Sequence, residues 1–191
     1  MQIAIISSSV RKGRNSHRAA LYILQYLEQQ NLATTDLMDL NEFNFPLFDE
    51  RLAYQKNPTD QMLDFSHRIK SADAVIIVTP EYNGGIPPAL KNVIDLLYNE
   101  WHRKPIGIMT ASDGDFGGTQ VIVSLVFTLW KIRAWVLPVR YPIPRVQDAF
   151  DETGNPVDKE TQDKRTKIFI NELFWCIEAT KRMHDYTQPI K

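Results

Sequence analysis

The sequence predicts a doubly wound α/β fold, in which a five-stranded parallel sheet of strand order 2-1-3-4-5 carries helices on both faces. Short apolar runs alternate along the chain with longer segments whose apolar residues recur at helical spacing. The run from Ala74 to Thr79 is apolar without alternation, as expected of a strand that is covered on both faces. We therefore place this run in the middle of the sheet.

Five strands and five helices account for the alternation. The strands are expected at Ile3 to Ser7, Thr34 to Leu40, Ala74 to Thr79, Ile106 to Ala111 and Ala134 to Val139. The helices are expected at Ser16 to Gln30, Asp60 to Ser71, Pro87 to Glu100, Gly118 to Arg133 and Lys159 to His184. Each helix has its own apolar stripe, which in the third helix continues through Leu97 and Trp101. The connection from Asn41 to Pro58 is long for such a link, which predicts a functional loop or a flap.

Size and composition favour one domain, residues 1–191, because no linker or composition break interrupts the chain. Hydrophobic residues make up 43% and charged residues 24%, which excludes a disordered chain. A net charge of −1 gives no support for nucleic acid or a membrane surface as a partner. The only cysteine is Cys176, so an internal disulfide is impossible, and the expected location is cytoplasmic.

Three loops with unusual residues follow the first, third and fourth strands. They comprise residues 7–16, 80–85 and 112–118. In a sheet of this order the three strands are neighbours where the strand order reverses, and ligands bind beyond their carboxyl ends. The three loops are therefore expected to meet at one edge of the sheet.

The first loop has the parts of an anion-binding site. It offers several serine hydroxyls, the guanidinium groups of Arg11 and Arg14, a turn at Gly13 and the start of a helix. A phosphate group would suit this loop. The alternative is that Asn15 or Ser16 only caps the helix, while the basic side chains point into water.

The second loop suits a planar ring. Pro80 stiffens the exit from the strand, Tyr82 can lie against a ring, and Gly84 and Gly85 permit a close approach of the main chain. The alternative is an ordinary Asn-Gly turn with Tyr82 as an incidental surface aromatic.

No metal site and no hydrolytic motif is indicated. Asp113 and Asp115 in the third loop lack the calcium-binding pattern and are expected to be solvated turn residues. The histidines His17, His67, His102 and His184 do not have metal-binding spacing. The chain also lacks the sequence signatures of P-loop nucleotide hydrolases, dinucleotide-binding folds, serine hydrolases and zinc proteases.

The same loops resemble the NADPH-dependent FMN reductase family, which includes quinone, azo-compound and chromate reductases. Residues 79–95, TPEYNGGIPPALKNVID, are similar to the family signature T-P-E-Y-N-x-S-I-P-x-x-L-K-N-x-I-D. The first loop resembles G-S-x-R-x-G-R-N-S, and residues 46–50 resemble P-L-[FY]-D-E. The chain departs from the pattern at Ser8, where the family usually has Gly, at Gly85, where it usually has Ser, and in residues 112–120. Beyond Arg133 the similarity is only architectural.

The resemblance implies a flavodoxin-like fold that binds FMN. By this resemblance the FMN phosphate is held by Ser9, Arg11, Asn15 and Ser16, the isoalloxazine and ribityl groups by Pro80, Glu81, Tyr82 and Asn83, and the pyrimidine side by Ser112, Gly117 and Gly118. Main-chain N–H groups near the last two residues would stabilise charge on reduced FMN. No catalytic side-chain acid or base is expected, because the flavin carries the redox chemistry.

The activity that the resemblance implies is a ping-pong transfer of electrons. NADPH or NADH would reduce FMN, and a small acceptor such as a quinone, a free flavin, an azo compound or a metal oxyanion would then be reduced. Because Arg11, Lys12 and Arg14 lie in the phosphate loop, this enzyme is favoured over a flavodoxin-type electron carrier without nucleotide turnover. A flavin-free sensor or scaffold is the third alternative.

The family resemblance also implies a homodimer or a dimer of dimers, in which the third and fourth helices of two subunits pack together. The helix from Gly118 to Arg133 is apolar around most of its circumference, so an outer face with Val123 or Phe127 would need a cover. In such a dimer Leu97, Tyr98 or Trp101 would approach the flavin of the other subunit. The alternative cover is the C-terminal helix of the same chain.

Overall fold

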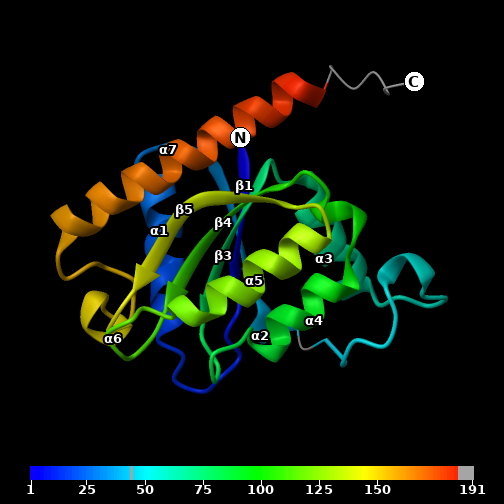
Figure 1. Cartoon of the computed structure of the whole chain (residues 1–191), viewed down its shortest axis with the longest axis horizontal. Coiled ribbons are helices and arrows are strands. Elements are labelled where there is room, and N and C mark those ends of the chain that lie inside the picture. Colours follow the sequence, from blue (N-terminus) through cyan, green and yellow to red (C-terminus); the bar gives the residue numbers. More distant parts are fainter. Residues whose placement is uncertain (44, 185–191) are drawn as a thin grey trace.

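The computed structural model describes residues 1–43 and 45–184, and its centre is a five-stranded parallel sheet (Figure 1). The strands are β1 (Gln2–Ser7), β2 (Thr34–Asp39), β3 (Ala74–Pro80), β4 (Pro105–Ala111) and β5 (Trp135–Ile143). They pair in the order β2-β1-β3-β4-β5, which confirms the predicted strand order. The apolar run of β3 lies in the middle and is buried along its length except at Pro80.

Helices cover both faces of the sheet (Figure 1). They are α1 (Ser16–Gln29), α2 (Leu40–Phe43), α3 (Asp60–Ser71), α4 (Pro88–Leu96), α5 (Thr119–Lys131), α6 (Val146–Ala149) and α7 (Lys159–His184), with short 3₁₀ turns at Leu52–Tyr54 and Asn99–Trp101. Helices α1 and α7 pack on one face, and α3, α4 and α5 pack on the other. No helix in the described ranges is long and apolar enough to cross a membrane.

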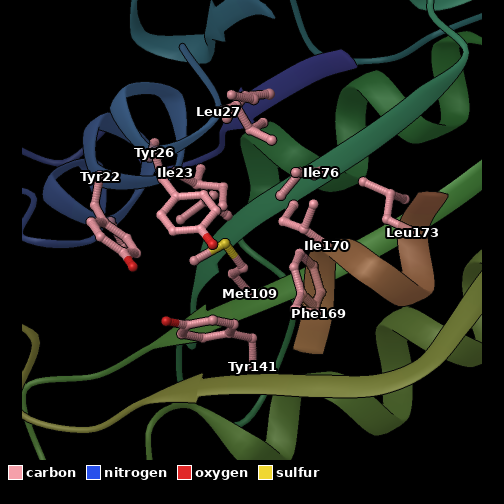
Figure 2. Close-up of a cluster of buried hydrophobic side chains, with 14 of the residues drawn as sticks. Tyr22, Ile23, Tyr26, Leu27, Ile76, Met109, Tyr141, Phe169, Ile170 and Leu173 are labelled. Carbon is pink, nitrogen blue, oxygen red and sulfur yellow. The ribbon is translucent and has the colours of Figure 1, made fainter. Parts of the chain in front are cut away.

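The core under α1 and α7 shows how the C-terminal helix is held (Figure 2). Phe169 and Leu173 of α7 are fully buried against the sheet, and the Phe169 ring meets the Tyr141 ring edge-on, with 5.6 Å between centroids. Gly107 of β4 leaves room for this ring, because a Cβ atom there would lie 2.5 Å from Phe169 Cζ. Burial of such side chains contributes roughly 1.5 to 3 kcal/mol each.

The largest differences between the structure and the predicted ranges are at the ends of two elements, α4 and β5. Helix α4 ends at Leu96 instead of Glu100, and a 3₁₀ turn then returns Trp101 to the core, where its Nε1 donates to Ile94 O at 3.2 Å. Leu97 and Trp101 are both buried, so the residues of the apolar stripe continue beyond the end of the helix itself. Strand β5 continues past Val139 to Ile143, because an edge strand tolerates prolines.

Candidate functional site

The loops after β1, β3 and β4 meet at the carboxyl edge of the sheet around a cavity of about 120 Å³. Its lining includes the predicted residues Ser9, Arg11, Asn15, Ser16, Pro80, Glu81, Tyr82 and Ser112, together with Gly13, Arg14, Ala111, Asp113 and Val146. The predicted residues Asn83, Gly117 and Gly118 do not line it. The structure therefore brings most of the predicted residues together at the point where the strand order reverses.

The side of the cavity nearest α1 presents groups that bind anions. Asn15 precedes α1 but its side chain makes no capping hydrogen bond, and its amide instead donates to Asp113 Oδ1 at 3.3 Å. The capping alternative for Asn15 is therefore wrong. Arg11 makes no ion pair with any other residue in the described part of the chain. Its guanidinium is therefore available to a ligand, whereas at the start of α1 the main-chain N–H groups of His17 and Arg18 already donate to Arg14 O at 3.3 Å and Asn15 O at 3.1 Å.

Arg14 has a different role from Arg11, because its side chain binds other residues of the protein and holds the first loop in place. Its guanidinium binds both carboxylate oxygens of Asp39 at the end of β2, and it also donates to Ser9 O at 2.8 Å. Burial disfavours ionisation of Asp39, but the hydrogen bonds from Arg14 and from Asn41 N–H outweigh it. The pKa of Asp39 therefore lies below its usual value.

His17 completes this network behind the first loop. Its Nδ1 lies 2.9 Å from Ser7 Oγ and 3.7 Å from Asp39 Oδ2. Burial and the Arg14 charge lower the pKa of His17, and they outweigh the attraction of Asp39. This lowering of the pKa favours the neutral form of His17. The sequence did not reveal this role, because nothing in it shows that α1 and β2 place His17 beside Asp39.

The second loop is a tight turn that is tied to the first loop. Asn83 and Gly84 both have positive φ, and Tyr82 and Gly85 exchange main-chain hydrogen bonds of 3.1 and 2.9 Å, as in a type I′ turn. The Tyr82 hydroxyl lies 2.8 Å from Ser9 Oγ. Tyr82 is therefore not an incidental surface aromatic, while Asn83 lies exposed at the tip of the turn.

The third loop is shaped by its packing on the sheet. Gly117 and Gly118 are buried with φ values of 63° and 70°. A Cβ atom on Gly117 would lie 2.8 Å from Ile143 N, and one on Gly118 would lie 3.0 Å from Ala111 O. The need for glycine at these positions therefore follows from close packing against the ends of β4 and β5.

Glu81 joins the second loop to the helix that follows the third. Its Oε2 accepts hydrogen bonds from the main-chain N–H groups of Gln120 at 2.8 Å and Val121 at 3.2 Å. A carboxylate in this position satisfies two amides that a helix start leaves without partners, and it interacts favourably with the helix dipole. The carboxylate of Glu81 is thus engaged within the protein, although the residue lines the cavity.

Sequence reasoning missed the contribution of the segment after β5. Val146, at the start of α6, lines the cavity, and its N–H donates to Ser112 O at 3.1 Å. The signal was present in the sequence, since a fifth parallel strand also ends at this edge. Because the predicted strand ended at Val139 and not at Ile143, the segment that begins at Val146 was not expected at the site.

The long connection after β2 lies to one side of the cavity. Asn92 of α4 holds it, because the Asn92 side chain accepts from Phe48 N at 2.6 Å and donates to Pro46 O at 2.8 Å. None of its described residues lines the cavity, so a flap over this site is not observed.

A larger hollow of about 1010 Å³ lies at the opposite edge of the sheet. Its lining includes Asp73 and Lys104, which directly precede β3 and β4, and Trp135, the first residue of β5. Ligands of open parallel sheets bind at the carboxyl ends of the strands, so position favours the smaller cavity as the functional site. The described ranges hold no group of three or more side chains that could bind a metal ion.

Fold and site together define a class: an open parallel α/β protein whose candidate site lies where the strand order reverses. The family model described as NADPH-dependent FMN reductase matches residues 1–148. The chain therefore belongs to the NADPH-dependent FMN reductase family, and it is an oxidoreductase.

Individual relatives agree with this assignment. The chain is 34% identical over 133 residues to an NAD(P)H-dependent FMN reductase of Saccharomyces cerevisiae, an alignment that covers 63% of this chain and 69% of the relative. It is 30% identical over 166 residues to a quinone reductase of Pseudomonas putida, covering 82% and 85%. The flavoenzyme NAD(P)H:(acceptor) oxidoreductase of Paracoccus denitrificans matches with a TM-score of 0.75 and 23% identity, over 93% of this chain and 97% of that one. This structural likeness confirms the flavodoxin-like fold.

Proposed function

We propose that the protein is an FMN-containing reductase that takes electrons from NADPH or NADH and passes them to a small acceptor. The acceptor classes are quinones, free flavins, azo compounds and metal oxyanions, and the order of reaction is ping-pong. The observation that supports the proposal is the cavity at the carboxyl edge of the sheet, where Arg11 and the hydroxyls of Ser9 and Ser16 come together. Bound FMN would supply hydride acceptance from the nucleotide and electron donation to the acceptor. With Cys176 as its one cysteine, the protein suits a reducing compartment, and we propose the cytoplasm.

The residues of the first loop fit the phosphate of FMN. Ser9 and Ser16 supply hydroxyls, Arg11 supplies a guanidinium, and the start of α1 supplies the positive end of a helix dipole, which together match a phosphate dianion. If Tyr82 donates to Ser9 Oγ, the Ser9 proton is left to donate to the phosphate. Arg14 is already neutralised by Asp39, so the charge that the phosphate meets comes from Arg11.

The size of the cavity indicates how the rest of FMN lies. Pockets that enclose whole ligands usually measure roughly 300 to 1,000 Å³. At about 120 Å³ this cavity suits a phosphate and the atoms next to it. The flavin ring would therefore extend over the second loop, between Pro80 and the turn at Asn83, with one face open to the nucleotide and the acceptor.

Rapid mixing separates the enzyme from a flavodoxin-type carrier. The FMN-loaded protein is mixed without oxygen with NADPH or NADH, and bleaching of the flavin absorbance is followed; reoxidation by a panel of quinones, flavins, azo dyes and metal oxyanions comes next. Reduction by a nucleotide within the time of turnover supports the proposal. A flavin that dithionite reduces, but neither nucleotide does, would identify a carrier instead.

Arg11→Ala should weaken FMN binding by about tenfold or more, because a charge-assisted hydrogen bond contributes roughly 1.5 to 3 kcal/mol. The measurement is titration of the FMN-free protein with FMN at fixed salt, followed by flavin fluorescence. Lys12→Ala in the same loop is the control, since Lys12 does not line the cavity. Equal FMN dissociation constants for wild type and Arg11→Ala would show that Arg11 does not bind the phosphate.

We also propose a homodimer that pairs through α5. The outer face of this helix exposes Val123 by 72%, Phe127 by 61% and Trp130 by 65%. Helix α7 packs on the other face of the sheet with α1, so covering by the C-terminal helix of the same chain is wrong (Figure 1). A twofold contact would let one apolar stripe cover its copy.

The dimer contact cannot use all the residues expected from the sequence. Leu97 is 2% and Trp101 0% exposed, so both are held in the core of their own subunit. Tyr98 is partly exposed, and the Arg51 guanidinium lies over its ring at 4.5 Å. Of Leu97, Tyr98 and Trp101, only Tyr98 therefore has exposed surface for the proposed contact with a second subunit.

Phe127→Glu should convert the dimer to a monomer, because a charge would be placed in the middle of the apolar stripe. Light scattering at micromolar concentrations gives the mass. Trp175→Glu is the matched control, because Trp175 is a 66% exposed aromatic residue on α7, on the other face. A wild-type mass near 22.1 kDa would reject the dimer, and a dimer that survives Phe127→Glu would place its interface elsewhere.

A further inference from the structure

We infer that Glu81 is a positioning residue that also sets the reduction potential of bound FMN, an inference that rests on the proposed function. Glu81 is the only acidic residue of the turn segment 80–85, and its carboxylate binds two main-chain N–H groups of α5. It also lines the cavity. The Glu81 side chain therefore links the second loop, which would carry the flavin ring, to the start of α5.

The first consequence concerns position. Tyr82 ties the second loop to the first through Ser9, and Glu81 ties the second loop to α5. The turn that follows Tyr82 contains Asn83 and Gly84, both at positive φ, and neither residue has an apolar side chain that could pack on the protein. The side-chain hydrogen bonds of Glu81 and Tyr82 therefore fix the position of the turn relative to α5 and to the first loop.

The second consequence concerns charge. The N–H groups at the start of a helix favour negative charge near them. Glu81 occupies the N–H groups of Gln120 and Val121, so they are not left to stabilise the charge that reduction adds to FMN. The carboxylate also places a fixed negative charge at the start of α5, on a residue that lines the cavity, and this charge opposes the added one. Both effects make the reduction potential more negative than an otherwise identical site would give.

Two substitutions separate position from charge. Glu81→Gln keeps an oxygen that can accept from both N–H groups but removes the charge, and Glu81→Ala removes the tie as well. Both variants should shift the midpoint potential of bound FMN to more positive values. Glu81→Gln should keep FMN affinity close to wild type, whereas Glu81→Ala should lose about tenfold, as expected when charge-assisted hydrogen bonds are lost. Glu178→Gln on α7 removes one charge at a 58% exposed side chain and is the control.

Amide hydrogen exchange of the FMN-free protein tests the tie without any cofactor. Exchange at Gln120 and Val121 should be faster in Glu81→Ala than in wild type. If the wild-type protein binds FMN and Glu81→Gln has the wild-type potential, the inference on potential is overturned while the proposed function stands. If exchange and FMN affinity are unchanged in Glu81→Ala, the positioning role is overturned. A wild-type protein that binds no FMN would overturn the proposed function, and with it the inference on potential, but the exchange result would still decide the tie.

Discussion

Asp39→Ala should destabilise the protein by about 3 kcal/mol, because removal of one partner of a buried ion pair leaves the other charge uncompensated. The side chains of Arg14 and Asp39 are 17% and 7% exposed, so water can replace little of the lost interaction. Arg14 also holds Ser9 O, and Asp39 holds Asn41 N–H, so the first loop and the end of β2 should loosen together. Chemical denaturation measures the stability, and FMN titration measures the site.

Asp36→Ala is the matched control for this prediction. Asp36 is on the same strand and forms a similar two-point contact with Arg68, but it is 23% exposed and lies away from the cavity. Its loss should cost less and leave FMN affinity unchanged. If the two variants lose equal stability and neither loses FMN affinity, Asp39 does not hold the first loop in its binding conformation.

The pH dependence of stability offers an independent check on Asp39. The pKa of its carboxyl is lowered in the folded protein, so the unfolded chain binds a proton first as the pH falls. The stabilisation is complete above the ordinary carboxyl pKa of about 3.9 and is lost as the pH falls through the folded value. Asp39→Asn should therefore have a flatter fall in stability below about pH 4 than wild type.

The sequence predicted the architecture because its evidence was local and strong. The apolar run of β3 predicted burial on both faces, and the helical spacing of Phe169, Leu173 and Ile177 predicted a buried face on the C-terminal helix, which the structure places on the sheet. The three loops could be placed together from strand order alone, since parallel strands end at the same edge. Short elements such as α2 and α6, of four residues each, were missed because they are too short to show a period.

The details of the site depended on contacts between distant residues, which a single sequence does not show. Arg11 and Arg14 look alike in the first loop, yet within residues 1–43 and 45–184 only Arg14 pairs with a carboxylate, that of Asp39 on β2. Glu81 was predicted to line the flavin, and only the structure shows its carboxylate at the start of α5. Residue types therefore identified the kind of ligand, while pairing across the fold decided what each side chain does.

Gly117→Ala should destabilise the protein by about 3 kcal/mol or more, through two effects that add at one residue. A left-handed backbone costs a residue with a Cβ atom roughly 1 to 2 kcal/mol, and Gly117 has φ 63°. Its Cβ would also lie 2.8 Å from Ile143 N and 2.9 Å from Pro142 Cβ, and overpacking costs roughly 1 to 3 kcal/mol. Gly84→Ala separates these effects, because Gly84 has φ 78° but a Cβ atom there would meet nothing within 4 Å, so it should show only the backbone cost. Denaturation of both FMN-free variants gives the difference, and equal losses would mean that β5 moves aside at no cost. In that case close packing would no longer explain why residue 117 is glycine, and a direct contact with FMN would become the better explanation.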